Sequence, residues 1–217
     1  MPLLLVAALL CGAVFIAADL ALLPSALRYA AKPLTTLILI AWAWPRGAEQ
    51  PVQRHWLRLG LWLSLGGDVA LLWPQQGFLP GLVSFLLAHL AFIRSMTARS
   101  RFGAPPWPFL EYLGLAAALL GWVLWPGLPA DLRLPVIIYV AVLVAMAGQG
   151  AAWWMQQHSR VAGFAALGGA AFLVSDSLIA IDRFAGGVPL ATVWIHSLYW
   201  LSLALMISAL PARPALR

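Results

Sequence analysis

Charged residues are scarce in this 217-residue chain, because Asp, Glu, Lys and Arg together make up only 9% of it. About a quarter of an ordinary soluble domain is charged, so the scarcity excludes that class. Hydrophobic residues make up 63% of the chain. They fall into runs of about 17–22 residues, the length that an α-helix needs to cross a hydrocarbon core of ~30 Å. The composition therefore predicts an all-α, polytopic membrane protein, with residues 1–217 forming a single integral membrane domain.

Cysteine is nearly absent, since Cys11 is the only one, and an intramolecular disulfide is therefore excluded. A dense basic patch is also missing. The net charge of +6 comes from 13 Lys and Arg residues spread thinly over the ends of the predicted helices. This distribution is typical of charges that orient a membrane protein, and it gives no support for a nucleic-acid partner.

Several catalytic motifs are missing as well. The chain has no HExxH, no GxSxG and no glycine-rich loop of the kind that cradles phosphate. Two of the four histidines, His55 and His158, lie in predicted loops, and the two that remain are too few for a zinc site built on three histidines. These absences argue against a zinc hydrolase, a serine hydrolase of the GxSxG type and a nucleotide-binding enzyme.

Clusters of Pro, Gly and Arg divide the apolar runs into eight predicted transmembrane helices. The loops between them are short, so consecutive helices are expected to pack antiparallel in a single bundle, with Gly and Ala at the contacts. The predicted helices cover residues 2–19, 26–44, 56–73, 78–96, 107–125, 134–155, 161–181 and 189–210.

The basic residues predict an orientation. With eight spans both termini lie on one side, and nine basic residues fall on that side against four on the other. The excess favours cytoplasmic termini, and we expect a multi-pass protein of the cell membrane, namely a bacterial inner membrane. The nine are Arg46, Arg54, Arg58, Arg94, Arg99, Arg101, Arg160, Arg213 and Arg217. The four on the outer side are Arg28, Lys32, Arg133 and Arg183.

Two aspartates stand inside apolar runs, Asp68 in "GGDVALLW" and Asp176 in "FLVSDSLIAIDRF". A charged side chain at membrane depth costs about 2.5–3.5 kcal/mol, and it usually faces the bundle interior or a cavity. Both aspartates fall in the outer half of the predicted bundle. Gly66 and Gly67 are expected to leave room beside Asp68 for a neighbouring helix or a lipid tail.

Other ionisable residues are predicted at a similar depth. Lys32, His196 and Asp19 belong to the same outer half, and His89 lies near the midplane. Paired carboxylates with a cation and a histidine suit general acid–base catalysis, but they also suit proton-coupled transport of a small molecule or lipid. A transporter needs polar groups on both sides of the midplane. Their concentration on one side therefore favours an enzyme with a single mouth, and the cost of burying two carboxylates disfavours a purely structural role.

An ordered set of short motifs resembles the YhhN-type lysoplasmalogenase family of eight-helix membrane proteins. The set consists of "KPLTTLILI" (32–40), "GGDVALLWPQQGFLPGLVSFLLAHLAFI" (66–93) and "GGAAFLVSDSLIAIDRF" (168–184), followed by a polar last helix that contains tyrosine. The last helix, "WIHSLYWLSLALM", departs from the Tyr-Tyr-x-Gln pattern of the family. We assign Tyr199 to the tyrosine position and expect His196 to replace another polar group.

The resemblance implies an ether-bond hydrolase that cleaves the vinyl-ether bond of lysoplasmalogens, a class of lysophospholipid, into a fatty aldehyde and a glycerophospho-base. Asp68 and Asp176 would form the catalytic pair, one protonated and the other kept ionised by a cation. This mechanism requires no metal and no organic cofactor, and another ether lysolipid would fit the same site. The expected substrate-binding, orienting or proton-carrying residues are Lys32, Arg28, His89, His196 and Tyr199.

Overall fold

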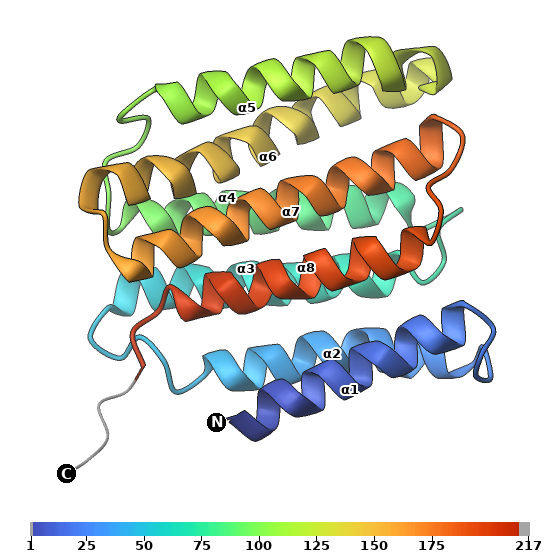
Figure 1. Ribbon diagram of the computed structural model, residues 1–217, viewed down its shortest axis with the longest axis horizontal. Helices are drawn as coiled ribbons and strands as arrows, with labels where there is room; N and C mark the ends of the chain where they lie inside the picture. Colours follow the sequence, from blue (N-terminus) through green and yellow to red (C-terminus); the bar gives the residue numbers. More distant parts are fainter. Residues whose placement is uncertain (1, 213–217) are drawn as a thin grey trace.

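The computed structural model describes residues 2–212, and over that range the chain is all α-helical with no strand. Eight helices follow one another, as predicted (Figure 1). Their bounds are α1 (Pro2–Asp19), α2 (Leu27–Ala43), α3 (Pro51–Ala70), α4 (Phe78–Thr97), α5 (Trp107–Ala118), α6 (Ala130–Gln157), α7 (Arg160–Phe184) and α8 (Ala191–Ser208). A π-helical segment, Leu119–Leu124, and a 3₁₀ turn, Trp125–Gly127, extend α5.

The predicted helix boundaries differ from the observed ones mainly at two N-termini. Helix α3 begins five residues early, with Pro51 at its first position, where the missing N–H leaves no hydrogen bond unmade. Helix α6 begins at Ala130 instead of residue 134, and Asp131 in its first turn complements the positive end of the helix dipole. The Pro-rich stretch before α6, which was expected to be a loop, thus contributes its first turn.

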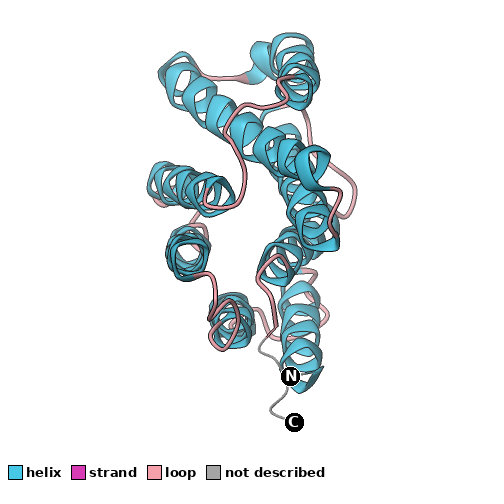
Figure 2. Cartoon of the chain, turned by 90° about the vertical axis from the view of Figure 1, so that its left-hand side faces the viewer, coloured by secondary structure: helices cyan, strands magenta, loops and turns pink. Residues whose placement is uncertain are grey.

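Consecutive helices run antiparallel, and both ends of the described chain lie at the same end of the bundle, on the left in Figure 1. Helix α8 packs on α7 and also contacts α1, α2 and α3, so it connects the N-terminal helices to the rest. Helix α5 packs mainly against α6 and stands at the edge of the bundle, as the end-on view in Figure 2 shows. This arrangement brings α2, α3 and α8 together in one region and α4, α5, α6 and α7 in another.

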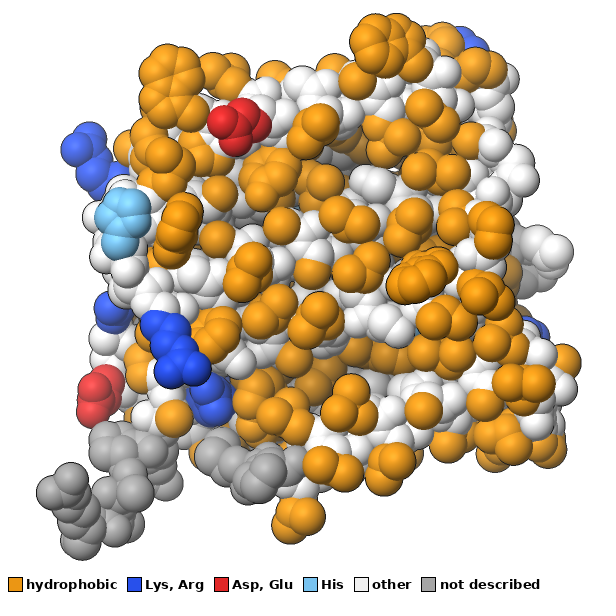
Figure 3. All heavy atoms as spheres, in the orientation of Figure 1, with side chains coloured by type: hydrophobic (Ala, Val, Ile, Leu, Met, Phe, Trp, Pro, Cys, Tyr) orange, Lys and Arg blue, Asp and Glu red, His pale blue; other side chains and the backbone are white. Residues whose placement is uncertain are grey.

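The apolar character of the helices extends over the surface of the bundle. Leu3 is 80% exposed and Trp122 is 84% exposed, and hydrophobic side chains cover most of the face seen in Figure 3. Among the described residues, five helical segments are long and apolar enough to cross a membrane: α4, α5 with its extension to Gly127, α6, α7 and α8. The chain is therefore a multi-pass membrane protein.

Helices α1 to α3 do not meet the same standard. Helix α1 offers a 17-residue apolar stretch, α2 is 17 residues long and includes Arg28 and Lys32, and α3 has a low mean hydropathy. That these three also cross the bilayer stays a prediction, as does the orientation of the termini. Arg213 and Arg217, which contributed to the predicted orientation, lie outside the described residues.

Small residues let the helices approach one another closely, as expected for membrane bundles. A Cβ on Gly67 would lie 2.4 Å from the ring of Phe85, so α4 fills the room beside Asp68 with that aromatic side chain. On α6, a Cβ on Gly150 would lie 2.8 Å from the backbone carbonyl oxygen of Ala165 on α7. Backbone gives way less easily than a side chain, so the α6–α7 contact depends on this glycine.

We therefore expect Gly150→Ala to destabilise the bundle. Overpacking costs about 1–3 kcal/mol and the better helix propensity of alanine returns at most about 1 kcal/mol, so the net effect should be a lower Tm. Gly114→Ala is the matched control, because nothing lies within 4 Å of a Cβ at this α5 position. Thermal unfolding in detergent measures both variants, and a Gly150→Ala protein as stable as the Gly114→Ala protein would contradict the prediction.

Candidate functional site

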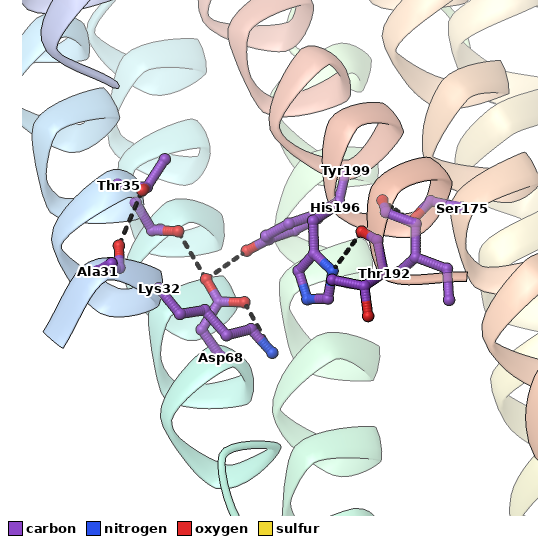
Figure 4. A network of polar contacts seen from close by, with 10 residues as sticks. Ala31, Lys32, Thr35, Asp68, Ser175, Thr192, His196 and Tyr199 are labelled. Atoms are coloured by element: carbon purple, nitrogen blue, oxygen red, sulfur yellow. Dashed lines mark hydrogen bonds and ion pairs between the residues drawn. The ribbon is translucent and has the colours of Figure 1, made fainter. Parts of the chain in front are cut away.

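Asp68 lies near the end of α3 and is buried, with 1% of its surface exposed. Its Oδ2 accepts hydrogen bonds from the Thr36 hydroxyl at 2.6 Å and from the Tyr199 hydroxyl at 2.8 Å. The Lys32 ammonium lies 3.9 Å from Oδ1. Figure 4 shows the side chains of Lys32 and Tyr199 converging on the Asp68 carboxylate. Asp68 thus connects α2, α3 and α8, and we call this group the Asp68 centre.

The local sequence explains how the Asp68 centre forms. Lys32 and Thr36 are four residues apart, so both lie on the face of α2 that meets α3. Ser64 lies one turn before Asp68 on the same face of α3, and its buried hydroxyl has no hydrogen-bond partner among residues 2–212. Lys32 is itself only 6% exposed. The Lys32–Asp68 pair is therefore enclosed by protein. The hydrogen-bond and ion-pair partners of the Asp68 carboxylate come from two other helices, α2 and α8.

Asp176 lies on α7 and forms a second group, which we call the Asp176 centre. Its Oδ2 accepts a hydrogen bond from the Tyr139 hydroxyl of α6 at 2.5 Å. Nε2 of His89, on α4, lies 3.9 Å from the same oxygen, and the His89 side chain is fully buried. Neither ring nitrogen of His89 has a hydrogen-bond partner in the described part of the chain. The Asp176 centre therefore combines a carboxyl, a phenol and an imidazole with free capacity.

Aromatic rings lie between the two centres. The Tyr199 ring packs edge to face on Phe172, with centroids 5.5 Å apart, and Phe172 packs edge to face on His89 at 4.7 Å. No hydrogen bond or ion pair in residues 2–212 joins Asp68 directly to Asp176, whereas these ring contacts lead from Tyr199, which donates to Asp68, to His89 beside Asp176. Tyr199 is thus the residue that connects the centres.

A cavity of about 90 Å³ lies between α4, α5 with its π-helical extension, α6 and α7. Asp176 and Tyr139 line it, and most of the remaining wall is apolar, including Phe85, Leu120 and Leu173. Asp68 and Lys32 are not among the lining residues. Asp176 therefore faces the cavity, whereas Asp68, its expected partner in a catalytic pair, does not.

The rotation of α7 explains this difference. The Ser175 hydroxyl donates to the backbone carbonyl of Ile195 at 2.9 Å, so this residue faces α8 (Figure 4). Asp176, one residue further on, is turned by about 100° around the 3.6-residue helix and faces α6 instead. A similar predicted depth therefore does not by itself place Asp176 next to Asp68, because the two residues also differ in direction around their helix axes.

The structure brings three of the five expected accessory residues to a carboxylate: Lys32 and Tyr199 to Asp68, and His89 to Asp176. It places the other two elsewhere. Arg28 lies 3.7 Å from Asp19 and donates to the Tyr29 hydroxyl in an exposed position.

His196 contacts the backbone carbonyl oxygen of Thr192 through Nδ1, at 2.9 Å. Its ring packs on that of Phe15, with centroids 4.4 Å apart. In residues 2–212 neither Arg28 nor His196 makes a hydrogen bond or an ion pair with Asp68 or Asp176.

Tyr139 is the functional candidate that sequence reasoning missed. It lies in the uncharged run "PVIIYVAVLV" (135–144), which reads as an ordinary membrane span. One signal was available, because a tyrosine hydroxyl in the middle of an apolar helix needs a hydrogen-bond partner. The contact of Thr36 with Asp68 was not predicted either.

Several known proteins are similar to this chain over 70% or more of its length. A lysoplasmalogenase of Mycobacterium tuberculosis is 34% identical over 163 residues, which cover 72% of this chain and 59% of that protein. The human lysoplasmalogenase TMEM86B is 33% identical over 186 residues, covering 82% and 74% of the two chains. An uncharacterized Escherichia coli membrane protein, YhhN, is 27% identical over 156 residues, covering 70% and 72%.

The aligned region therefore spans less than two thirds of the mycobacterial relative. No solved structure matches the chain. The model of the YhhN family matches residues 27–210, which run from the first residue of α2 to just beyond the end of α8. With most of its length matched in this way, the chain belongs to the YhhN family.

Proposed function

We propose that this protein is an intramembrane hydrolase that cleaves the vinyl-ether bond of lysoplasmalogens and releases a fatty aldehyde and a glycerophospho-base. The observation that carries the proposal is the position of Asp176, a carboxyl beside a phenol on the wall of a mostly apolar cavity. An alkenyl chain fits such a wall, and its hydrolysis begins with a proton donor. The lysoplasmalogenase names of the relatives support the same reaction.

The chemistry requires an acid at a carbon atom. Asp176 would give its proton to the vinyl carbon that does not bear oxygen, and the π electrons would form the new C–H bond while the ether oxygen shares its lone pair to give an oxocarbenium ion. Water would then add to the oxocarbenium carbon and return a proton to the Asp176 carboxylate, leaving a hemiacetal. Loss of the hemiacetal hydroxyl proton, with protonation of the departing glycerol oxygen, gives the aldehyde, so that one water is consumed overall.

The surroundings of Asp176 suit both of its roles. Oδ2 accepts from Tyr139, which leaves Oδ1 as the oxygen that carries the proton. In residues 2–212 no Lys or Arg lies within ion-pair distance of this carboxyl. His89 lies outside the cavity lining, with Nε2 3.9 Å from Oδ2 of Asp176 and neither ring nitrogen bonded within residues 2–212, so it would act on the reaction through Asp176. The cavity is walled mostly by apolar side chains, so it suits the vinyl-ether segment and the adjoining part of the lipid chain.

Asp68 has a different role in this proposal from the one expected for a catalytic pair. It lies outside the cavity and is bound by a lysine, a threonine and a tyrosine. We assign Asp68 and Lys32 the task of fixing α2, α3 and α8, and of holding Tyr199 against Phe172 behind the Asp176 centre. Asp68 is thus a positioning residue, and Asp176 is the catalytic one.

The proposal extends to the membrane. The bacterial inner membrane, with both termini in the cytoplasm, follows the excess of arginines on that side. In this orientation the Phe78 and Phe184 end of the cavity faces the outer leaflet, from which a lysophospholipid would enter.

The first test is aldehyde release by purified protein in detergent, with 1-alkenyl-lysophospholipid as substrate. Asp176→Asn should lose activity by at least about 10²-fold, the lower range for a missing general acid, while its Tm stays near that of the wild type. Asp182→Asn is the matched control, because this exposed neighbour on α7 only accepts a hydrogen bond from the Val188 N–H, which an amide oxygen also accepts.

Near wild-type activity of Asp176→Asn would exclude the proposed catalytic role. If wild-type protein releases no aldehyde and instead drives proton-linked uptake into liposomes, the hydrolase proposal fails and the transporter replaces it.

A second test separates the roles of the two aspartates. Asp68→Asn leaves the buried Lys32 without its counter-charge, and breaking a buried pair costs about 3–5 kcal/mol, so both Tm and activity should fall. The double variant Lys32→Met/Asp68→Asn removes both charges and keeps an acceptor for Tyr199. It should regain the Tm of the wild type and an activity within about tenfold of it, a difference of about 1.4 kcal/mol. Restored stability with activity still absent would show that Asp68 takes part in the chemistry.

A further inference from the structure

We propose that Arg133 and Arg183 form a phosphate-binding rim at one end of the cavity and that the ligand is the phosphate of a lysophospholipid whose chain lies against Asp176. The proposal rests on the proposed function for the identity of the substrate. It adds the residues that recognise the headgroup, in place of Lys32 and Arg28. Those two cations are already paired with Asp68 and Asp19.

Arg183 is attached to the aromatic wall of the cavity. Its guanidinium carbon lies 4.0 Å from the centroid of the Phe78 ring and 5.8 Å from that of Phe184. Both rings line the cavity and pack edge to face, with centroids 6.0 Å apart. The side chain is exposed, and no ion pair involves it in the part of the chain that the structure describes. The cation is therefore positioned over the cavity end by its aromatic contacts and is available to an anion.

Arg133 approaches the same end from α6. Its guanidinium carbon lies 4.6 Å from the Trp125 ring, and Trp125 directly follows Leu124, another residue that lines the cavity. Its buried Nε has no hydrogen-bond partner among residues 2–212, which leaves an N–H donor unsatisfied. A buried donor without a partner is costly, and a ligand oxygen would satisfy it.

The two arginines belong to one contiguous layer. The turn Trp125–Gly127 packs directly on the end of α7, since a Cβ on Gly127 would lie 1.8 Å from the carbonyl oxygen of Phe184. Arg133 lies over the first residue of that turn, and Arg183 precedes Phe184. Two guanidinium groups with parallel N–H donors suit the oxygens of a phosphate better than a single ammonium does.

The spacing between the rim and the Asp176 centre fits the glycerol part of the lipid. Arg183 lies seven residues beyond Asp176 on α7, and Arg133 lies six residues before Tyr139 on α6. At 1.5 Å per residue these intervals are about 10.5 Å and about 9 Å. The length of a glycerol backbone together with that of an arginine side chain is enough to span this interval. The phosphate would then lie at the rim while the sn-1 vinyl ether lies at Asp176.

The test measures binding of two uncleaved lipids to protein in nanodiscs, by titration of tryptophan fluorescence. The ligands are 1-alkyl-lysophosphocholine, which has the phosphate, and 1-alkylglycerol, which lacks it. Arg183→Ala and Arg133→Ala should each weaken binding of the phospholipid by about tenfold, equivalent to about 1.4 kcal/mol, and leave binding of the alkylglycerol unchanged. Arg160→Ala is the matched control, because Arg160 makes a similar cation–π contact with Phe164 at the opposite end of α7 and should change neither.

The binding measurements test the phosphate-binding rim independently of the hydrolase activity. Equal binding of the two lipids by wild-type protein, or rim variants with unchanged preference, would overturn the rim even if aldehyde release is normal. Tight binding of inorganic phosphate in the absence of any preference for the phospholipid would assign the arginines to free phosphate and also overturn the proposal. Absence of aldehyde release would overturn the hydrolase alone, since neither binding ligand needs to be cleaved.

Discussion

A carboxylate placed among apolar helices has to receive its polar partners from the protein, because lipid offers none. This constraint organises the structure around two aspartates. Asp68 takes donors from α2 and α8, which ties the N-terminal helices to the last one. Asp176 takes one donor from α6 and leaves an oxygen toward a cavity. The more fully satisfied aspartate connects the helices, and the less satisfied one is left available for chemistry.

In the proposed mechanism the two aspartates therefore have separate roles, with Asp176 as the catalytic residue and Asp68 as a positioning residue. Tyr199 donates to Asp68 and packs on Phe172, which packs in turn on His89 beside Asp176. The cavity lies on the α5 side, where packing is sparse and a π-helical segment contributes Leu119, Leu120 and Leu124 to the wall. π-Helical turns are often found at functional sites, and here the segment borders the space proposed for the substrate. Packed aromatic rings on one side of Asp176 and a mostly apolar cavity on the other suit the proposed lipid hydrolase.

Much of the fold was predictable from the sequence, because hydropathy and Pro/Gly punctuation mark helices along the chain. The position of a residue along its helix axis could also be estimated from the sequence, because each helical residue adds a rise of about 1.5 Å. Rotation about each helix axis could not, and it separates Asp176 from the α8-facing Ser175 and from Asp68. Tyr139 was not predicted as a site residue, because an uncharged residue in an apolar run does not stand out by charge. Arg28 and His196 were expected at the site, but Arg28 pairs with Asp19 and His196 contacts the backbone of Thr192.

The central claim is that the reacting bond meets Asp176 and not Asp68. The most direct measurement is an experimental structure of the protein with a bound 1-alkyl-lysophospholipid, the saturated analogue of the substrate. The account predicts the ether oxygen and the adjoining chain carbons beside the Asp176 carboxyl and Tyr139, inside the cavity between α4, α5, α6 and α7. An ether group bound instead beside Asp68 and Lys32, between α2, α3 and α8, would contradict it.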